Sequence, residues 1–126
     1  MFQIRCDRSI PKRIKKRLVH AAHWLEERYK FRTHIKLVLR NQCCIKHPEC
    51  GRCWGVYSRI TKTIQLACGC KAPHLYEHLD TLMHEFVHYD QARRGIAMHH
   101  RGIKKRVKRI LQEYCTTYNL VLKDIL

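Results

Sequence analysis

The chain has 126 residues, of which 45% are hydrophobic, and such a chain suits one compact domain with a single packed core. No stretch approaches the ~20 consecutive apolar residues of a membrane-spanning helix, and the first residues lack the apolar core of a signal peptide. A formal net charge of +16 at pH 7 exceeds what solubility requires and points to a polyanionic partner. We therefore expect a single domain over residues 1–126, soluble and intracellular, in the cytoplasm or the nucleoid or nucleus, with no membrane partner.

The first predicted element is a helix that runs to about Tyr29. Ser9 is expected to cap it and Pro11 to open it, because hydroxyl side chains and proline favour these positions. Its buried stripe recurs at helical spacing and consists of Ile14, Leu18, Ala21, Leu25 and Tyr29. Cations crowd its first turns, namely Lys12, Arg13, Lys15, Lys16 and Arg17. A phosphate backbone would gain from this cluster, so we expect nucleic-acid contact here.

Two extended segments come next. From His34 to Arg40, apolar and charged residues largely alternate, which predicts a half-buried strand. Trp54 to Ala67 is rich in β-branched and aromatic residues, and is either one long strand or a hairpin that turns near Thr61. Between these segments, residues 41–52 have the composition of an irregular, cysteine-bearing loop. Together with the helices, the two segments predict an α+β domain with a small, mostly antiparallel sheet.

The eight cysteines require a separate explanation. Thiols are kept reduced inside cells, so metal ligation or burial is favoured over disulfides. Cys50 and Cys53 precede the second extended segment, and Cys68 and Cys70 follow it, so a hairpin would gather four thiolates at one end. Four sulfurs predict a second, structural zinc, with two disulfides or unpaired thiols as the alternatives. The substitute ligands nearby are Cys43, Cys44 and His47. The cysteines expected to be buried free thiols are Cys6 and Cys115.

The segment between Pro73 and Gly95 predicts a helix of about twenty residues, because proline suits the start of a helix and glycine its end. Its apolar stripe consists of Leu75, Leu79, Leu82 and Phe86. Asp80 lies one turn before His84 and is a candidate to orient that ring, with a plain surface role as the simpler interpretation.

The middle of this helix carries His-Glu-Phe-Val-His at residues 84–88, a match to the H-E-x-x-H pattern. Residues four apart on a helix point the same way, so His84 and His88 can present two imidazole nitrogens to one zinc ion. Glu85 stands beside the metal, where a carboxylate can take a proton from a zinc-bound water whose pKa is lowered to roughly 7. A chain with 10 histidines can carry such a pattern by chance, but the position within a helix favours a metal site over two ordinary histidines.

A catalytic zinc usually has three protein ligands, and the downstream candidates are His99, His100 and Glu113. The helix that follows has an apolar stripe of Ile103, Val107, Ile110, Leu111 and Tyr114. His99 lies one turn before Ile103 on that inward face, so it is the first choice. Glu113 is about 21 Å further along the helix axis, so one helix cannot offer both ligands.

This last helix also carries a second basic cluster of Lys104, Lys105, Arg106, Lys108 and Arg109. Both clusters predict phosphate-dominated, salt-sensitive binding to nucleic acid, with Trp24 or Trp54 as candidates to stack on the bases of single strands.

Hydrolysis of a peptide bond also needs a group that polarises the substrate carbonyl. The candidates for this role are Tyr89, Tyr114, Tyr118 and His100.

The stretch from Val56 to Tyr114 resembles the SprT-like metalloprotease family. That family has H-E-x-x-H, a variable loop and a third histidine, which residues 84–88 and His99 match. The chain departs from the family at His100, where the family has glycine, and at Ile103, where it has phenylalanine or tryptophan. The resemblance implies a protease that acts on proteins attached to DNA, and the basic composition agrees with this.

Other relatives of this motif keep further possibilities open. Small peptidases similar to the ImmA family take a glutamate from the following helix, which would make Glu113 the third ligand. In zincin proteases generally, an edge strand beside the active site pairs with the substrate backbone, and Val56–Leu66 is the expected strand. We expect a zinc-dependent metallopeptidase with Glu85 as its catalytic base and a protein or peptide substrate. The alternatives are an ImmA-like regulatory peptidase and a non-catalytic, basic, nucleic-acid-binding zinc protein.

Overall fold

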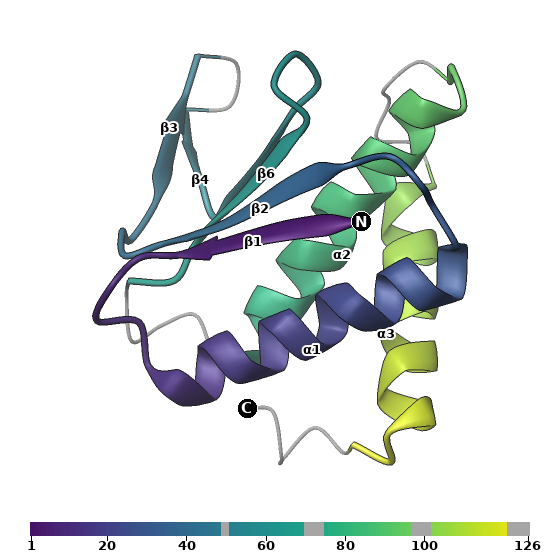
Figure 1. Cartoon of the computed structure of the whole chain (residues 1–126), viewed down its shortest axis with the longest axis horizontal. Helices are drawn as coiled ribbons and strands as arrows, with labels where there is room; N and C mark the ends of the chain where they lie inside the picture. The colour runs from purple at the N-terminus through teal and green to yellow at the C-terminus, as the bar shows by residue number, and fades with distance from the viewer. Residues whose placement is uncertain (49–50, 70–74, 97–101, 121–126) are drawn as a thin grey trace.

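The computed structural model describes residues 1–48, 51–69, 75–96 and 102–120 (Figure 1). The elements in chain order are β1 (Phe2–Cys6), α1 (Lys12–Tyr29), β2 (Ile35–Arg40), β3 (Ile45–His47), β4 (Gly51–Cys53), β5 (Gly55–Ser58), β6 (Thr63–Ala67), α2 (Leu75–Arg93) and α3 (Ile103–Thr117). Helices cover a sheet in one compact α+β arrangement, as the sequence predicts. No helix in these ranges is both long enough and apolar enough to cross a membrane.

The main sheet has four strands in the order β1-β2-β6-β5. β1 and β6 both pair with β2 in parallel, and β5 pairs with β6 in antiparallel. The prediction of a mostly antiparallel sheet is therefore wrong for this sheet. The physical reason is α1, which connects β1 to β2 and returns the chain to the end of the sheet where β1 began. The small β3-β4 hairpin is a separate antiparallel pair.

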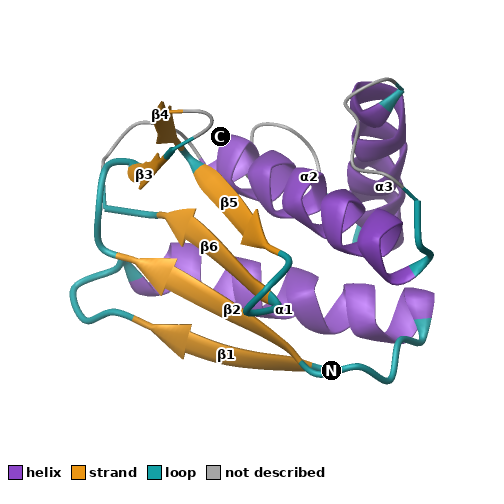
Figure 2. Ribbon diagram, turned by 90° about the horizontal axis from the view of Figure 1, so that it is seen from above, coloured by secondary structure: helices purple, strands orange, loops and turns teal. Residues whose placement is uncertain are grey.

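The helices lie on one side of the main sheet. α1 packs along β1, and α2 packs along β5 and β6, while α3 packs on α2 (Figures 1 and 2). The core between sheet and helices is built from apolar side chains, including Leu18, Leu25, Leu37, Leu39, Ile64, Leu66, Leu79, Leu82 and Phe86. Burial of this apolar surface is what holds the helices against the sheet.

The helical patterns are confirmed with one correction. All five predicted stripe residues of α3 are buried, and so are those of α2. α2 has 19 residues, and Gly95 follows it with φ +70°, the left-handed conformation that suits glycine. Ser9, however, does not cap α1. Ser9 adopts φ 73° and Pro11 occupies the N-cap position without a side-chain hydrogen bond.

The strand patterns are confirmed in part. β2 buries Ile35, Leu37 and Leu39 on one face, as its alternation predicts. The Trp54–Ala67 segment is a hairpin, with its turn between β5 and β6. Two features were not predicted: the strand β1, and the β3-β4 hairpin, which falls mostly in the segment expected to be an irregular loop. The five residues of β1 alternate in burial, but so short a segment gives a weak signal without its partner β2.

Candidate active site

The two motif histidines come from the same side of α2. α2 buries its apolar stripe against the sheet, and this fixes the rotation of the helix about its axis. His88 is buried and His84 is half-buried. Their Nε2 atoms lie 3.1 Å apart, and their rings are inclined at 76°. The spacing along the helix therefore does bring the two nitrogens together.

This geometry fits a zinc ion. Two nitrogens bound to one tetrahedral zinc at about 2.0–2.1 Å lie about 3.3 Å from each other. The observed 3.1 Å between the two Nε2 atoms is close to that value. Imidazole nitrogen is also a preferred zinc donor, so both the chemistry and the spacing of this pair suit the metal.

Glu85 is the buried carboxylate of the site. Its side chain is on the inner part of α2 and is 7% exposed. Burial raises the pKa of Glu85 to about 7, and a hydrogen bond from the backbone N–H of Tyr57 offsets part of that rise. A carboxyl group with a pKa near 7 can both accept and release a proton at neutral pH, which is the property of a general base or acid.

β5 is one of the two edge strands of the main sheet and lies directly against α2. The Ala67 N–H donates to the Trp54 carbonyl at 2.8 Å, so the alternation of an antiparallel ladder directs the backbone groups of Gly55 and Tyr57 away from β6. The hydrogen bond from the Tyr57 N–H to Glu85 agrees with this direction. The remaining outward groups of β5 can pair with another extended chain.

A cleft of about 330 Å³ lies between β5 and α2. Its lining residues are Arg52, Trp54, Gly55, Asp80, Thr81, His84 and Glu85. Gly55 allows the close approach of strand and helix, because a Cβ there would lie 2.5 Å from Thr81 Cγ2. The cleft therefore joins the edge strand, one motif histidine and the buried carboxylate in one space.

The third metal ligand is not identified among the described residues. They contain no group of three or more His, Cys, Asp or Glu side chains able to hold a metal ion. His99 and His100 lie outside the described residues. Glu113 instead pairs with Arg28 of α1, with Nε and Oε1 2.5 Å apart. This ion pair directs the Glu113 carboxylate to α1 and weakens the ImmA-like alternative.

Asp80 lies beside His84 in the cleft. Desolvation raises the pKa of Asp80, and the neighbouring His84 lowers it in part. The two side chains thus interact electrostatically, which keeps Asp80 as a candidate to orient the ring of His84.

The tyrosines considered for the substrate carbonyl lie elsewhere. Tyr89 and Tyr114 are 2% and 0% exposed within the core. The Tyr114 hydroxyl is 2.8 Å from His20 Nδ1, between α1 and α3, and the Tyr118 ring makes an edge-to-face contact with the same histidine. None of these tyrosines is among the described residues that line the cleft.

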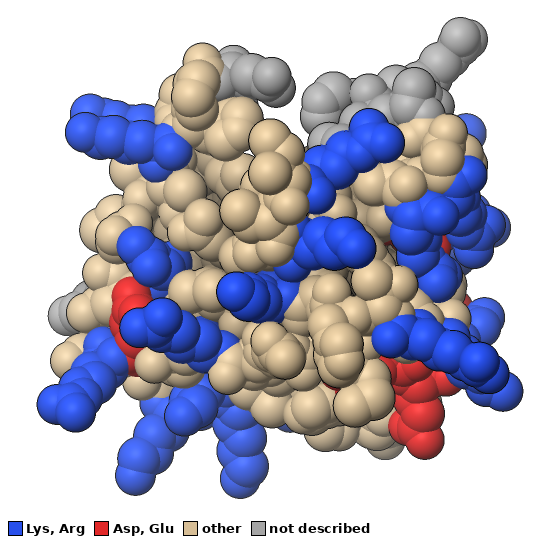
Figure 3. Space-filling view, turned by 45° about the horizontal axis from the view of Figure 1, so that its top comes forward, with Lys and Arg blue, Asp and Glu red and all other residues tan. Residues whose placement is uncertain are grey.

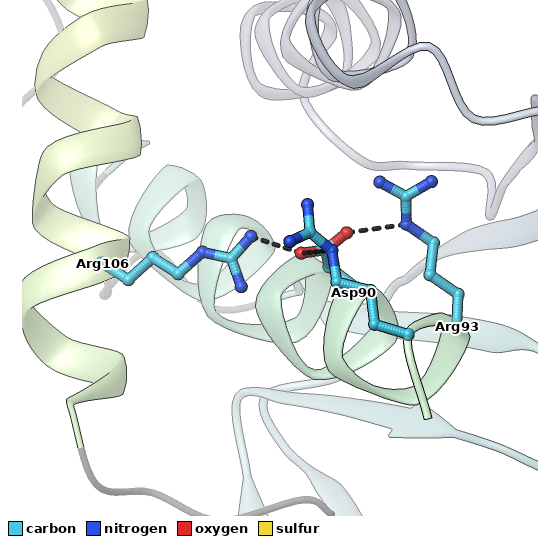
Figure 4. A network of polar contacts seen from close by, with 4 residues as sticks. Asp90, Arg93 and Arg106 are labelled. Atoms are coloured by element: carbon cyan, nitrogen blue, oxygen red, sulfur yellow. Dashed lines mark hydrogen bonds and ion pairs between the residues drawn. The ribbon is translucent and has the colours of Figure 1, made fainter. Parts of the chain in front are cut away.

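A buried ion-pair network ties the end of α2 to α3. Asp90 is 0% exposed and accepts hydrogen bonds from Arg93 at 2.6 Å and from Arg106 of α3 (Figure 4). Arg94 adds an ion pair at 3.2 Å. Burial alone would raise the pKa of Asp90, but the hydrogen bonds and charges of Arg106 and Arg93 outweigh it and lower the pKa. Arg106 therefore has a structural partner within the protein, which removes it from the predicted phosphate-binding cluster.

The cysteines do not form one site of the predicted kind among the described residues. Cys68 is a free thiol in the hydrophobic core, where burial raises its pKa to about 12. Cys53 and Cys43 each take part in a disulfide bond. Cys50 and Cys70 lie outside the described residues. The two cysteines predicted to be buried free thiols, Cys6 and Cys115, are free, but they are only partly buried.

The helical basic clusters are mostly exposed. Lys12, Arg13, Lys15 and Lys16 of α1 are exposed, and so are Lys104, Lys105, Lys108 and Arg109 of α3. Arg17 is half-buried and lies within 3.5 Å of the Tyr114 hydroxyl. Trp24 is buried against Tyr114 and cannot stack on a base, whereas Trp54 is 49% exposed. Lysine and arginine side chains spread across the face of the molecule shown in Figure 3.

The structure adds cleft residues that the sequence did not reveal. Arg52, Gly55 and Thr81 line the cleft, and Tyr57 reaches Glu85 through its backbone. A backbone N–H has no sequence signature, and Arg52 lies in the segment that was predicted to be an irregular loop. Only the pairing of β5 with β6 places these residues beside α2.

The fold and the site together define a small α+β protein with a histidine pair and a buried glutamate beside an edge strand. No known protein-family model and no curated protein matches the sequence. Among solved structures, the chain is similar to a crystal structure of Wss1 from Saccharomyces cerevisiae, with 14% identity over 94% of both chains and a TM-score of 0.49. A likeness of this size transfers no residue role to the present chain.

Proposed function

We propose that this protein is a zinc-dependent metallopeptidase that cleaves proteins associated with DNA. The observation that carries the proposal is the 3.1 Å separation of His84 Nε2 and His88 Nε2, which matches two donors of one metal. The sequence resemblance to SprT-like proteases supports the reaction. The net charge of +16 supports a substrate held near nucleic acid.

His84 and His88 would hold the metal, and His99 is the preferred third ligand. A bound zinc would supply a Lewis acid that polarises a carbonyl and lowers the pKa of a water molecule. Glu85 would accept the proton of the attacking water and pass it to the leaving amine.

The substrate would lie along β5. Its backbone would pair with the outward groups of Gly55 and with the Tyr57 carbonyl, since the Tyr57 N–H is engaged by Glu85. This strand addition would place a peptide bond at the cleft that Glu85 and His84 line. Arg52 also lines the cleft and can donate hydrogen bonds to substrate carbonyls.

The test separates metal binding from cleavage. In the full chain, Glu85→Gln is expected to keep its zinc and to lose cleavage of a DNA-bound protein by about 100-fold or more, because the general base is removed. His84→Ala and His88→Ala are expected to lose both zinc and cleavage. Zinc is measured by atomic absorption, and cleavage by the appearance of product fragments. Glu27→Gln, an exposed glutamate of α1, is the matched control.

Two outcomes would change the conclusion. Full activity of Glu85→Gln would reject the peptidase mechanism, and a wild type that binds zinc yet cleaves nothing would favour the non-catalytic binding protein. Zinc content of His99→Ala, His100→Ala and Glu113→Ala identifies the third ligand. Loss of zinc only in the Glu113 variant would restore the ImmA-like alternative despite the Arg28 pair.

A further inference from the structure

The outer face of the main sheet carries a hollow that the cleft does not use. Core residues alternate along the strands with residues that face away from the helices, and none of the described helices covers this second face (Figure 2). The hollow has a volume of about 570 Å³. It is lined by side chains of β1, β2 and β6, chiefly Gln3, Arg5, Lys36, Arg40, Thr63 and Gln65.

The strand register places these side chains in rows across the sheet. Gln3, Lys36 and Thr63 stand side by side in one row. Arg5, Val38 and Gln65 form the next row, two residues further along each strand. Neighbouring strands are about 4.8 Å apart, and residues two apart on a strand are about 6.6 Å apart. Two cations, three hydrogen-bonding side chains and Val38 therefore share one continuous surface.

The charged side chains of this surface are all positive. Three cations line the hollow, and the lining residues include no carboxylate. Within the described part of the chain, Arg5, Lys36 and Arg40 form no ion pair. Arg40 is half-buried, and its Nε has no hydrogen-bond partner among the described residues. A buried Nε–H without an acceptor carries a cost, and an anion bound to this guanidinium would reduce it.

We propose that this sheet face binds the phosphate backbone of a nucleic acid. Arg5, Lys36 and Arg40 would neutralise phosphates, and the Gln65 amide would donate hydrogen bonds to phosphate oxygens. The lining residues include no aromatic ring on which a base could stack. Binding is therefore independent of sequence and falls steeply with salt.

The hollow lies close to the cleft. Gln65 in the hollow pairs with Val56 of β5, and the preceding residue of β5, Gly55, lines the cleft. A nucleic acid on the sheet face would thus lie within two strands of the cleft, on the opposite side of the sheet from the helices. The proposal does not depend on peptidase activity, because the face is complete without a metal.

Fluorescence anisotropy with a labelled 20-nucleotide DNA, single-stranded and duplex, tests the proposal in the Glu85→Gln background. Arg5→Gln, Lys36→Gln and Arg40→Gln together are expected to weaken binding roughly tenfold or more at 0.15 M salt. The slope of log affinity against log salt should fall by about two to three, as expected for the loss of three phosphate contacts. The matched control is Lys104→Gln, Lys105→Gln and Lys108→Gln on α3, which removes the same charge from exposed positions.

The proposal stands if the sheet-face variant loses at least about threefold more affinity than the α3 variant, and it is overturned by any smaller difference. Equal affinity for vesicles that contain phosphatidylserine would also overturn it, because that result would indicate general anion attraction. Circular dichroism checks that each variant is folded. If the triple variant does not fold, Arg5→Gln and Lys36→Gln at exposed positions are compared with two of the lysine variants by the same criterion.

Discussion

Two carboxylates of α2 show how strongly the surroundings of a single residue determine its role. Glu85 and Asp90 are both buried, at 7% and 0% exposure. Glu85 has one backbone hydrogen bond and a pKa raised to about 7 by burial. Asp90 is surrounded by arginines that hold its pKa low. Glu85 is thus able to exchange a proton at neutral pH, whereas Asp90 stays charged and holds α2 to α3.

His78 gives a prediction at the same scale. Its side chain is 2% exposed on α2, and its Nε2 has no hydrogen-bond partner among the described residues. Burial lowers its pKa below the ordinary value of 6.5. Below pH 6.5 the unfolded chain therefore binds a proton at His78 that the folded chain resists, so the free energy of unfolding falls as the pH drops.

We expect His78→Leu to reduce this pH dependence by at most about 1.4 kcal/mol per pH unit. Urea unfolding at pH 7.5 and 5.5, with a chelator present so that metal binding does not contribute, measures the difference. His34→Leu, at an exposed histidine, is the control. Identical pH dependence in wild type and His78→Leu would show that His78 does not resist protonation.

At the scale of elements, the contact between β5 and α2 shapes the cleft. β5 can lie close to the helix because Gly55 has no side chain, and the nearest helix atom is Thr81 Cγ2. Thr81 is held in place by its β-branch and by a 2.8 Å hydrogen bond from its hydroxyl to the Glu77 carbonyl. The strand and the helix therefore have little freedom to separate without loss of packing.

Gly55→Ala is expected to destabilise the protein by about 1–3 kcal/mol, because the new methyl group overlaps Thr81. Thr81→Ser removes the methyl group and keeps the hydroxyl, so the double variant should recover most of that loss. Urea unfolding of both single variants and the double variant gives the coupling energy. Additive effects would show that the methyl contact is not the cause.

Element types were largely predictable, and element pairings were not. The stripes of α2 and α3 and the alternation of β2 are local patterns, and each predicted the buried face correctly. The parallel pairing of β1 with β2 depends on the path of α1, which no local pattern specifies. Likewise, β3 and β4 have three residues each, and such short strands are defined by each other rather than by their own sequences.

The same division holds for the candidate site: its local features were predictable, and its long-range contacts were not. The spacing of His84 and His88 follows from helix geometry alone, and the structure places their Nε2 atoms together. The partners of charged residues were not predictable. Arg106 pairs with Asp90, and Glu113 pairs with Arg28 of a distant helix. Each pair joins segments whose contact depends on how α3 packs.

At the scale of the whole molecule, charge dominates the surface. With a net charge of +16 on 126 residues, the positive side chains repel one another. This repulsion is stronger in the folded state, because the charges lie closer together there than in the unfolded chain. The interior compensates only locally, as with Asp90 and its arginines. Counter-ions are therefore expected to stabilise the fold.

We expect the melting temperature to rise by several degrees between 0.05 M and 0.5 M sodium chloride, because salt screens this repulsion. Differential scanning calorimetry measures the change. The variant with Lys104, Lys105 and Lys108 replaced by glutamine should melt higher than wild type at low salt and respond less to added salt. A melting temperature that falls with salt would show that exposed ion pairs such as Arg28 with Glu113 outweigh the repulsion.

The sequence by itself determined the features that depend on neighbours along the chain. These are the helical faces, the alternation of β2, the histidine pair of residues 84–88 and the excess of positive charge. Only the tertiary structure decided the strand order, the burial of Glu85 against the edge strand and the basic hollow on the outer sheet face. The physical reason is that side-chain periodicity is set by local backbone geometry, whereas a pKa, an ion pair or a hollow depends on segments that meet only after the chain has folded.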